Sequence, residues 1–400
     1  MALDEKIYDL RREKLKQIEA LGQPTYRSKY EFTHTVDQIL AHYTAKTAEE
    51  LDQARVNVRV AGRIMAIRLM GKAGFAHIQQ GGKKLQIYVK KDAVGEKGFD
   101  LYRLLDLGDH IGVSGYLFRT RTGELSVHVE QVEFLSKDLL PLPEKWHGLT
   151  DVELRYRQRY VDLVMNPEVR DVFLKRTKII QSMRRTFDSH DFIEVETPMM
   201  HPIAGGAVAR PFVTHHNTLD MDLYLRIAPE LYLKRLVVGG LDRVYEINRN
   251  FRNEGLGWRW NPEFTMLEAY QAYTNYQGIM DLTQESITEA AKAVNGSPIS
   301  KWGDAEIDWS NWQRMTMREA IIKFWPEGSG AKPEMIDFAS DEGVKKLVER
   351  FNAGHSHMAY DAAAPAGKNI AALFEAAAEE HLTQPTIIYE FPTAVSPLSK

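Results

Sequence analysis

The segment RNFRNEGLGWRWNPEFTMLEAYQAY, residues 249–273, decides how the second half of this chain folds. It carries three arginines, three asparagines and three glutamates among the aromatic and apolar residues of a core element. From residue 244 onward, the polar side chains fall at every second position: Glu246, Asn248, Asn250, Arg252 and Glu254. Side chains two residues apart share one face of a strand, so the pattern predicts a strand with a wholly polar face.

A second strand, residues 263–270, is predicted to return after the loop of residues 255–262. Its even positions put four side chains on one face: Phe264, Met266, Glu268 and Tyr270. An antiparallel pair would then offer a platform of an aromatic ring, a carboxylate and a phenol beside Arg252 and Glu254. A solvated face with a ladder of salt bridges is one alternative, and a helix from Thr265 onward is another.

Length and composition bound the class of protein. With 400 residues and 44% hydrophobic content, the chain is long enough for two or more domains. It has no run of 18 apolar residues, and its N-terminus is charged throughout, so neither a membrane span nor a secretory signal is predicted. We therefore expect a cytoplasmic protein with no membrane partner. The absence of cysteine excludes disulfides, thiolate catalysis and cysteine-ligated metals.

The first 150 residues are predicted to form a separate domain whose charge is compatible with nucleic-acid binding. An amphipathic helix ends at Gly22, and five short strands between Val56 and Leu135 predict a small Greek-key barrel. Residues 1–150 carry 23 Lys and Arg against 20 Asp and Glu (+3), whereas residues 151–400 carry 28 against 35 (−7). The difference weakly favours a polyanionic partner for the first part.

A proline-containing linker separates this part from the rest. Pro141 and Pro143 mark the linker, and Thr150 with Glu153 forms a predicted capping box that begins a helix. The domain boundary is placed there, giving domains 1–150 and 151–400. Beyond it we expect a helix over residues 167–189, a strand, turn and helix over 223–240, and a mostly helical insertion at about 277–385.

The 249–273 segment also resembles a known motif. FRNEGLGWRWNPEFTMLEAYQAY is similar to motif 2 of the class II aminoacyl-tRNA synthetases and, in detail, of the bacterial-type lysyl-tRNA synthetases. FIEVETPMM resembles their motif 1, and PIAGGAVARPFVTHHNTLDMDLYLRIAPELYLKRLVVGG resembles their lysine-site segment. VAGRIMAIRLMGKAGFAHIQ resembles their anticodon-binding barrel. The resemblance covers nearly the whole chain, loosely over about 300–385.

The resemblance implies an α+β protein: an N-terminal OB-fold β-barrel, then a class II catalytic domain built on an antiparallel sheet with a helical insertion. It also implies a homodimer formed through motif 1. The activity implied is the ATP-dependent attachment of lysine to tRNA(Lys) through a lysyl-adenylate, with Mg²⁺ as cofactor. ATP would bind without a phosphate loop, and no G-x-x-x-x-G-K-[ST] motif occurs.

The resemblance assigns roles to individual residues of the catalytic domain. The ATP-binding residues it implies are Arg252, Glu254, Asn261 and Phe264, with Arg252 catalytic at the α-phosphate and the Phe264 ring under the base. The lysine-binding residues it implies are Gly206, Glu230, Glu268 and Tyr270. A guanidinium suits charge developing on phosphorus, and a carboxylate suits a buried ammonium. Phe264 and Glu268 are ~13 Å apart along a strand, enough to hold base and ammonium at opposite ends.

In the barrel, the resemblance implies an anticodon surface. The residues it implies are Arg68, Phe75, Gln86 and Glu124, which would read the U-rich lysine anticodon by stacking and by hydrogen bonds to base edges. Without the resemblance, Phe75 would be interpreted as a phenylalanine of the barrel core.

Two departures from the family pattern stand out. Trp260 occupies a motif 2 position where the family usually has histidine. The match also ends at EFPTAVSPLSK, where the family continues for ~100 residues with motif 3 and acidic Mg²⁺ ligands. We therefore expect a C-terminally incomplete catalytic domain, no metal ligands before Lys400, and a chain that dimerises but is inactive.

Two alternatives remain open. An aspartyl- or asparaginyl-tRNA synthetase would share the barrel and motif 2, and a non-catalytic RNA-binding or dimerising fragment would need no complete ATP site. Two histidine pairs, His215 with His216 and His355 with His357, lack a third ligand at a recognised spacing and are read as surface residues.

Overall fold

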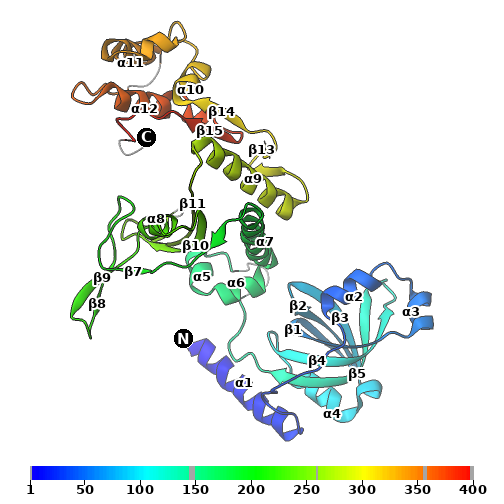
Figure 1. Cartoon of the computed structure of the whole chain (residues 1–400). Helices are drawn as coiled ribbons and strands as arrows, with labels where there is room; N and C mark the ends of the chain where they lie inside the picture. The colour runs from blue at the N-terminus through cyan, green and yellow to red at the C-terminus, as the bar shows by residue number, and fades with distance from the viewer. Residues whose placement is uncertain (1, 144–148, 258–259, 355–357, 397–400) are drawn as a thin grey trace. The chain divides into compact units, whose positions relative to one another are not determined.

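The computed structural model describes residues 2–143, 149–257, 260–354 and 358–396. It divides into two compact units, Met1–Phe173 and Leu174–Lys400 (Figure 1). The division falls inside one long helix, so that the helix begins in the first unit and ends in the second. Each unit is built around its own sheets and core.

The first unit contains a closed barrel of five strands. They are β1 (Asn57–Met70), β2 (Ala73–Gln80), β3 (Lys83–Lys90), β4 (His110–Arg119) and β5 (Leu125–Ser136), in the order β1-β2-β3-β5-β4 with β4 closing on β1. Inward side chains alternate with outward ones along each strand, as in β3, where Leu85, Ile87 and Val89 are buried. The predicted five-stranded barrel is confirmed.

Helices surround this barrel: α1 (Ala2–Ala20), α2 (Val36–Tyr43), α3 (Ala48–Ala54) and α4 (Lys91–Leu104), the last lying between β3 and β4. The two shortest begin with reciprocal capping boxes, Thr35 with Gln38 and Thr47 with Glu50. Each box satisfies amide groups that a first helical turn leaves unpaired, which stabilises helices too short to form alone.

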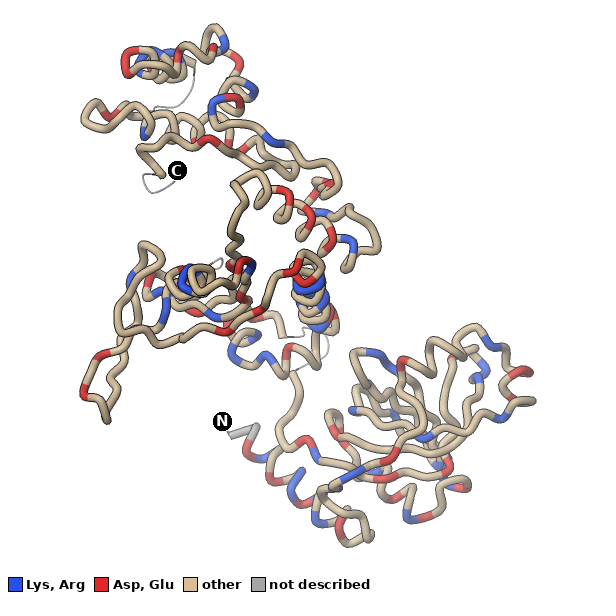
Figure 2. The backbone as a smooth tube through the Cα atoms, in the orientation of Figure 1, with Lys and Arg blue, Asp and Glu red and all other residues tan. Residues whose placement is uncertain are grey.

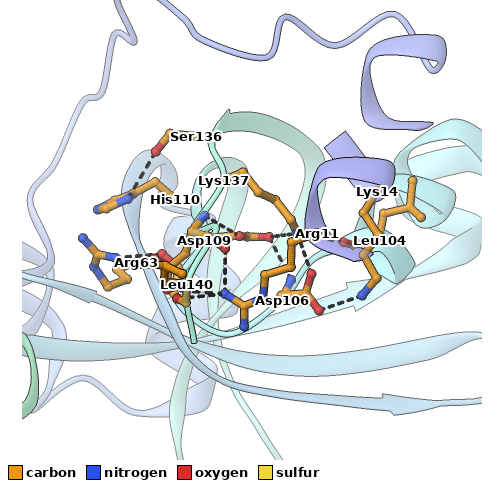
Figure 3. A network of polar contacts seen from close by, with 12 residues as sticks. Arg11, Lys14, Arg63, Leu104, Asp106, Asp109, His110, Ser136, Lys137 and Leu140 are labelled. Carbon is orange, nitrogen blue, oxygen red and sulfur yellow. Dashed lines mark hydrogen bonds and ion pairs between the residues drawn. The ribbon is translucent and has the colours of Figure 1, made fainter. Parts of the chain in front are cut away.

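A buried ionic network joins α1 to the barrel (Figure 3). The Lys137 ammonium donates to Asp109 at 2.7 Å and to Asp106 at 2.6 Å, and the Lys137 and Asp109 side chains are fully buried. Lys14 of α1 donates to the other oxygen of Asp106 at 2.6 Å. Two lysines therefore neutralise two carboxylates, which makes their burial tolerable and fixes where α1 lies.

Three helices follow the barrel: α5 (Val152–Arg157), α6 (Arg159–Met165) and α7 (Pro167–Ser189). The helix predicted over residues 167–189 is confirmed. The predicted capping box at Thr150 is wrong, because α5 begins one residue later than expected. Asp151 is the N-cap, and its carboxylate accepts from the amide of Leu154 at 2.8 Å.

The second unit carries two small three-stranded sheets. One has the order β11-β10-β6, with β6 (Ile193–Glu194), β10 (Arg243–Phe251) and β11 (Glu263–Gln271). The other has the order β7-β9-β8, with β7 (Met200–His201), β8 (Val213–His216) and β9 (Met221–Leu225). Helix α8 (Glu230–Val238) follows β9 and leads into β10. The predicted strand, turn and helix over 223–240 is confirmed.

After β11, the chain is mainly helical, with α9 (Tyr276–Asn295), α10 (Met317–Lys323), η1 (Met335–Phe338), α11 (Asp341–Gly354), α12 (Ala366–Ala377) and η2 (Glu379–His381). Two strand pairs accompany them, β12 (Ile299–Trp302) with β13 (Ala305–Asp308), and β14 (Gln313–Thr316) with β15 (Thr386–Tyr389). Leu347, Ile370 and Leu373 belong to a buried apolar cluster of this region.

Charge is unevenly distributed between α7 and α9. Six lysines and arginines lie on α7, visible as a series of blue bands in Figure 2, against three acidic residues. Helix α9 has three acidic residues and one lysine. His190, just after α7, contacts Glu285 of α9 at 2.9 Å. Within the part of the chain that the structure describes, no helix has the length and apolarity to cross a membrane.

Candidate functional site

The hairpin of β10 and β11 brings the residues of both predicted strands onto one face. Its register places Asn250 opposite Phe264, Asn248 opposite Met266 and Glu246 opposite Glu268. Directly opposite residues of an antiparallel pair project to the same side, so all six share one surface. The predicted strand pair is confirmed, and a helix from residue 265 is excluded.

One alternative for this polar face was a solvated surface with a ladder of salt bridges, and the burial of its side chains excludes it. Glu246 and Asn250 are each only 1% exposed. Arg252 and Glu254 lie just beyond the end of β10, although the Arg252 amide still donates to the Pro262 carbonyl at 2.9 Å. The hairpin face is therefore a buried polar floor, which indicates a site rather than plain surface.

One end of the floor holds a carboxylate beside a phenol. The Tyr270 hydroxyl donates to Glu268 at 3.3 Å. Burial raises the pKa of the Glu268 carboxyl, the Tyr270 hydrogen bond opposes that shift, and the negative charge of nearby Glu230 adds to it. Burial and the adjacent carboxylate also raise the pKa of Tyr270. These groups are poised to accept a cation.

Helix α8 and a glycine turn complete this end. Gly206 has φ +90°, and a Cβ added there would lie 3.2 Å from the Cβ of Ala228 and 3.3 Å from that of Glu230. Glu230 accepts from Lys234 at 2.6 Å, and the Lys234 ammonium lies 5.9 Å from the Tyr270 ring centroid. The geometry therefore brings together Gly206, Glu230, Glu268 and Tyr270.

The other end of the floor holds the aromatic ring and the arginine. The Arg252 guanidinium carbon lies 5.2 Å from the centroid of the Phe264 ring. Asn261 is exposed and donates from its amide to the Glu263 carbonyl at 2.6 Å, and Glu254 is exposed too. Trp260 is 72% exposed. Residues 258 and 259 of the same loop lie outside the described part of the chain.

A second surface lies on the barrel. A cavity of about 870 Å³ is lined by Arg68, Phe75 and Gln86 together with the rings of Tyr88 and Phe118. Phe75 is half-buried and its ring centroid lies 4.7 Å from that of Tyr88. Phe75 is thus outside the buried core of the barrel, and its ring is available for stacking on a base.

Glu124, the fourth residue predicted for this surface, is hydrogen-bonded to residues that line the cavity. The Gln86 amide donates to Glu124 at 2.7 Å, and His77 contacts the other Glu124 oxygen at 3.0 Å. The buried Ser126 hydroxyl donates to the Gln86 amide oxygen at 2.8 Å. A carboxylate can only accept, so these contacts point the Gln86 NH₂ group at Glu124. His77 and Ser126 were not anticipated from the sequence.

Both parts of the chain match known families. Residues 151–400 match the family described as tRNA synthetases class II (D, K and N). The chain belongs to the class II tRNA synthetases. Residues 58–135, which form most of the barrel, match the family described as OB-fold nucleic acid binding domain. The α+β architecture, with an OB-fold before a class II domain, is thereby confirmed.

Three similar curated proteins are lysine–tRNA ligases. The chain is 50% identical over 398 residues to the lysine–tRNA ligase of Halalkalibacterium halodurans, covering 98% of this chain and 76% of that protein. It is 49% identical over 397 residues to that of Carboxydothermus hydrogenoformans, covering 99% and 78%. It is 47% identical over 407 residues to that of Dichelobacter nodosus, covering 100% and 80%. The resemblance to lysyl-tRNA synthetases is thus confirmed.

The class II domain also contains a buried ion pair that sequence reasoning missed. Arg226 donates to Glu246 at 2.7 Å, and both side chains are 1% exposed. The Thr197 hydroxyl donates to the second Glu246 oxygen at 2.6 Å, and Arg226 also donates to the Arg249 carbonyl at 2.9 Å. The feature of the sequence that could have indicated this ion pair is a single arginine between two apolar residues, Leu225 and Ile227.

The described residues include no group of three or more His, Cys, Asp or Glu side chains that could hold a metal ion. His215 contacts Asp222 at 3.0 Å and Asp220 at 3.3 Å, at the edge of the β8–β9 pair. The second histidine pair, residues 355 and 357, falls outside the described residues.

Proposed function

We propose that the sites on this chain serve the attachment of lysine to tRNA(Lys) through a lysyl-adenylate formed from ATP. The observation that carries the proposal is the charge balance at the Glu268 end of the floor. Three carboxylates meet there, Glu230, Glu246 and Glu268, and two cations pair with them, Lys234 with Glu230 and Arg226 with Glu246. Within the described residues, Glu268 has no salt-bridge partner.

A lysine ammonium would provide the missing charge. An ionised carboxylate that is half-buried without a cation is unfavourable, and its raised pKa reflects this. A substrate ammonium between Glu268 and Tyr270 would neutralise the carboxylate, whereas a neutral side chain would leave it unsatisfied. An aspartate side chain would add a fourth negative charge, so the aspartyl alternative is disfavoured. Gly206 and Glu230 are proposed to hold the α-amino end.

The first proposed step is nucleophilic attack of a lysine carboxylate oxygen on the α-phosphorus, with pyrophosphate leaving. No general base is needed, because the attacking carboxylate is already ionised. Arg252 is proposed to contact the α-phosphate and offset the charge that develops there, while the Phe264 ring holds the base. Glu254 and Asn261 are proposed to contact the nucleotide. In the second step the tRNA 3′ end attacks the lysyl carbonyl, and AMP leaves.

Magnesium is proposed to arrive with the triphosphate, as its counterion. The described residues hold no cluster of metal ligands, and no step above depends on the ion. Because the reaction serves protein synthesis, its proposed location is the cytoplasm. The functional division proposed is residues 1–150 for anticodon binding and 151–400 for catalysis.

The barrel is proposed to read the anticodon. Phe75 offers a stacking ring, Arg68 a cation, and Gln86 with Glu124 an adjacent donor and acceptor. A uracil edge presents a carbonyl next to an N–H, which this donor and acceptor would complement. Homodimerisation through the motif 1 segment is also proposed. Two apolar side chains of that segment are exposed, Ile193 at 49% and Met200 at 54%.

A thermal-shift panel tests the proposed function. The purified chain is heated with each amino acid in turn, with and without ATP. Lysine should raise Tm by mass action, whereas aspartate and asparagine should not. Stabilisation by aspartate or asparagine instead of lysine would contradict the proposal and favour the sister specificities. Stabilisation by none of the three would favour a non-catalytic role.

A further inference from the structure

The Arg252 guanidinium covers a face of the same ring that is proposed to carry the base. Its central carbon lies 5.2 Å from the Phe264 centroid, within the range of a cation–π contact. A purine stacked on that face would need the space that the guanidinium fills. The same guanidinium is proposed to contact the α-phosphate of ATP. Arg252 therefore has two possible partners, the Phe264 ring and the α-phosphate.

A buried atom shows that the ring position leaves Arg252 incompletely satisfied. Its Nε is buried and has no hydrogen-bond partner among the described residues. Buried donors are nearly always paired, and an unpaired one is a destabilising feature. A hydrogen-bond acceptor for Nε at another position would therefore favour movement of the Arg252 side chain off the ring.

An unpaired acceptor lies on the same floor. Asn250 is 1% exposed, and its Oδ1 is buried without a partner among the residues described. Its amide nitrogen donates to the Met266 sulfur at 3.2 Å, which leaves the oxygen on the other side of the amide. Asn250 lies opposite Phe264 in the ladder and two residues before Arg252, so all three side chains share one end of the face.

We propose that Arg252 has two positions: over the Phe264 ring in the free protein, and beside Asn250 once a base occupies the ring. In the second position, Asn250 Oδ1 accepts the Arg252 Nε–H, and the terminal nitrogens face the α-phosphate. Asn250 is then a positioning residue for Arg252. The arrangement favours base-bearing triphosphates over bare polyphosphates, because only a base releases the guanidinium. This inference rests on the proposed ATP site.

Calorimetric titration with adenosine and with ATP separates the two positions. Adenosine has the base without phosphate, so it competes with Arg252 for the ring and gains nothing from it. The Arg252→Ala variant should bind adenosine about two- to fivefold more tightly than the wild-type chain, the equivalent of one exposed cation–π contact. It should bind ATP at least ~10-fold more weakly, because the charged phosphate contact is lost.

Asn250 variants test the second position. Asn250→Leu should leave adenosine affinity unchanged and weaken ATP binding about 10-fold, roughly the effect of one hydrogen bond to a charged group. Asn250→Asp keeps an oxygen acceptor and should restore ATP affinity. Lysine binding at the other end of the floor reports whether each variant is folded. The matched control is Arg249→Ala, which removes a guanidinium from the other face of β10 and should change neither titration.

The outcomes distinguish this inference from the proposed function. Opposite changes in adenosine and ATP affinity on removing Arg252, with rescue by Asn250→Asp, support it. Adenosine affinity that is unchanged or weaker in Arg252→Ala would overturn the ring position. ATP affinity unaffected by Asn250→Leu would overturn the role of Asn250. A wild-type chain that binds neither lysine nor ATP would instead contradict the proposed function.

Discussion

Glu246 and Glu268 lie directly opposite one another on the β10–β11 floor, yet only Glu246 has a cation, the buried Arg226. Burial raises the pKa of Glu268, and the negative charge of Glu246 adds to that shift. Arg226 forms its salt bridge with Glu246, and its effect on Glu268 is the weaker one of a nearby charge. Glu246 thus belongs to a buried ion pair, and Glu268 is left for the proposed contact with the lysine ammonium.

Removing the open charge should abolish lysine binding selectively. In Glu268→Gln, the substrate ammonium loses its carboxylate partner, and losing one member of a desolvated charge pair typically costs ~2–5 kcal/mol, or at least ~30-fold in affinity. ATP binding, centred on Arg252 and Phe264, should persist. Calorimetry with each ligand measures both.

The matched control for this variant is Glu263→Gln, at the exposed start of the same strand. It should bind lysine as the wild-type chain does. Equal lysine affinity in the wild-type chain and in Glu268→Gln would remove Glu268 from the lysine site.

Lysine binding should depend on pH through the same carboxyl group. Burial raises the pKa of Glu268, so binding an ammonium requires the group to lose its proton in the range just above its ordinary value. Lysine affinity should therefore fall as pH is lowered through this range, by up to ~10-fold per unit. Titrations in two buffers of different ionisation enthalpy should detect proton release.

The stability of the free protein should change in the opposite direction. The folded-state pKa lies above the unfolded value, so folding favours the protonated form, and this contribution is lost as pH rises through the raised pKa. Lysine binding without any proton release between the ordinary and the raised pKa would contradict the assignment.

Breaking the buried pair should damage the fold rather than one ligand site. Arg226→Met leaves Glu246 buried without a cation, which typically costs ~3–5 kcal/mol of unfolding free energy. Pairing it with Glu246→Leu removes both charges and should recover much of that loss. Urea unfolding of the two variants measures the difference. A single variant as stable as the wild-type chain would show that the pair is not structural.

The barrel surface should respond independently of the catalytic unit. Phe75→Ala removes one stacking ring and should weaken binding of a lysine anticodon stem-loop by ~1–3 kcal/mol. Tyr26→Ala removes an exposed aromatic side chain that does not line the cavity and should have no effect. Filter binding measures both, with lysine binding unchanged. Equal stem-loop affinity for Phe75→Ala and the wild-type chain would exclude Phe75 from the anticodon surface.

Local periodicity was sufficient to predict much of the architecture. Alternation of polar and apolar residues, glycine turns and helical spacing are short-range signals. They were enough to predict the β10–β11 hairpin and its polar face, the five barrel strands and α7. Motif resemblance then nominated Glu268, Tyr270 and Phe75. The observed cap, Asp151, is one residue after the predicted one, because Thr150 and Asp151 are both N-cap residue types and aspartate is the stronger of the two.

The contacts that give the floor its chemistry could not be predicted in this way. Arg226 reaches Glu246 from the position after β9, a strand of a separate sheet, and only the fold brings the two together. The same holds for Arg252 over Phe264, since strand spacing fixes the face on which each side chain lies and not where a long guanidinium rests. Burial of Glu246 and Asn250 decided between a solvated face and a site, and alternation alone is silent on burial.

A crystal structure of the chain with L-lysine and a non-hydrolysable ATP analogue would show both ends of the floor occupied. The substrate Nζ should lie within hydrogen-bond distance of the Glu268 carboxylate and the Tyr270 hydroxyl, and the purine should stack on Phe264 at the other end of the floor. A lysine ammonium bound away from Glu268, or a purine bound away from the Phe264 ring, would contradict these assignments.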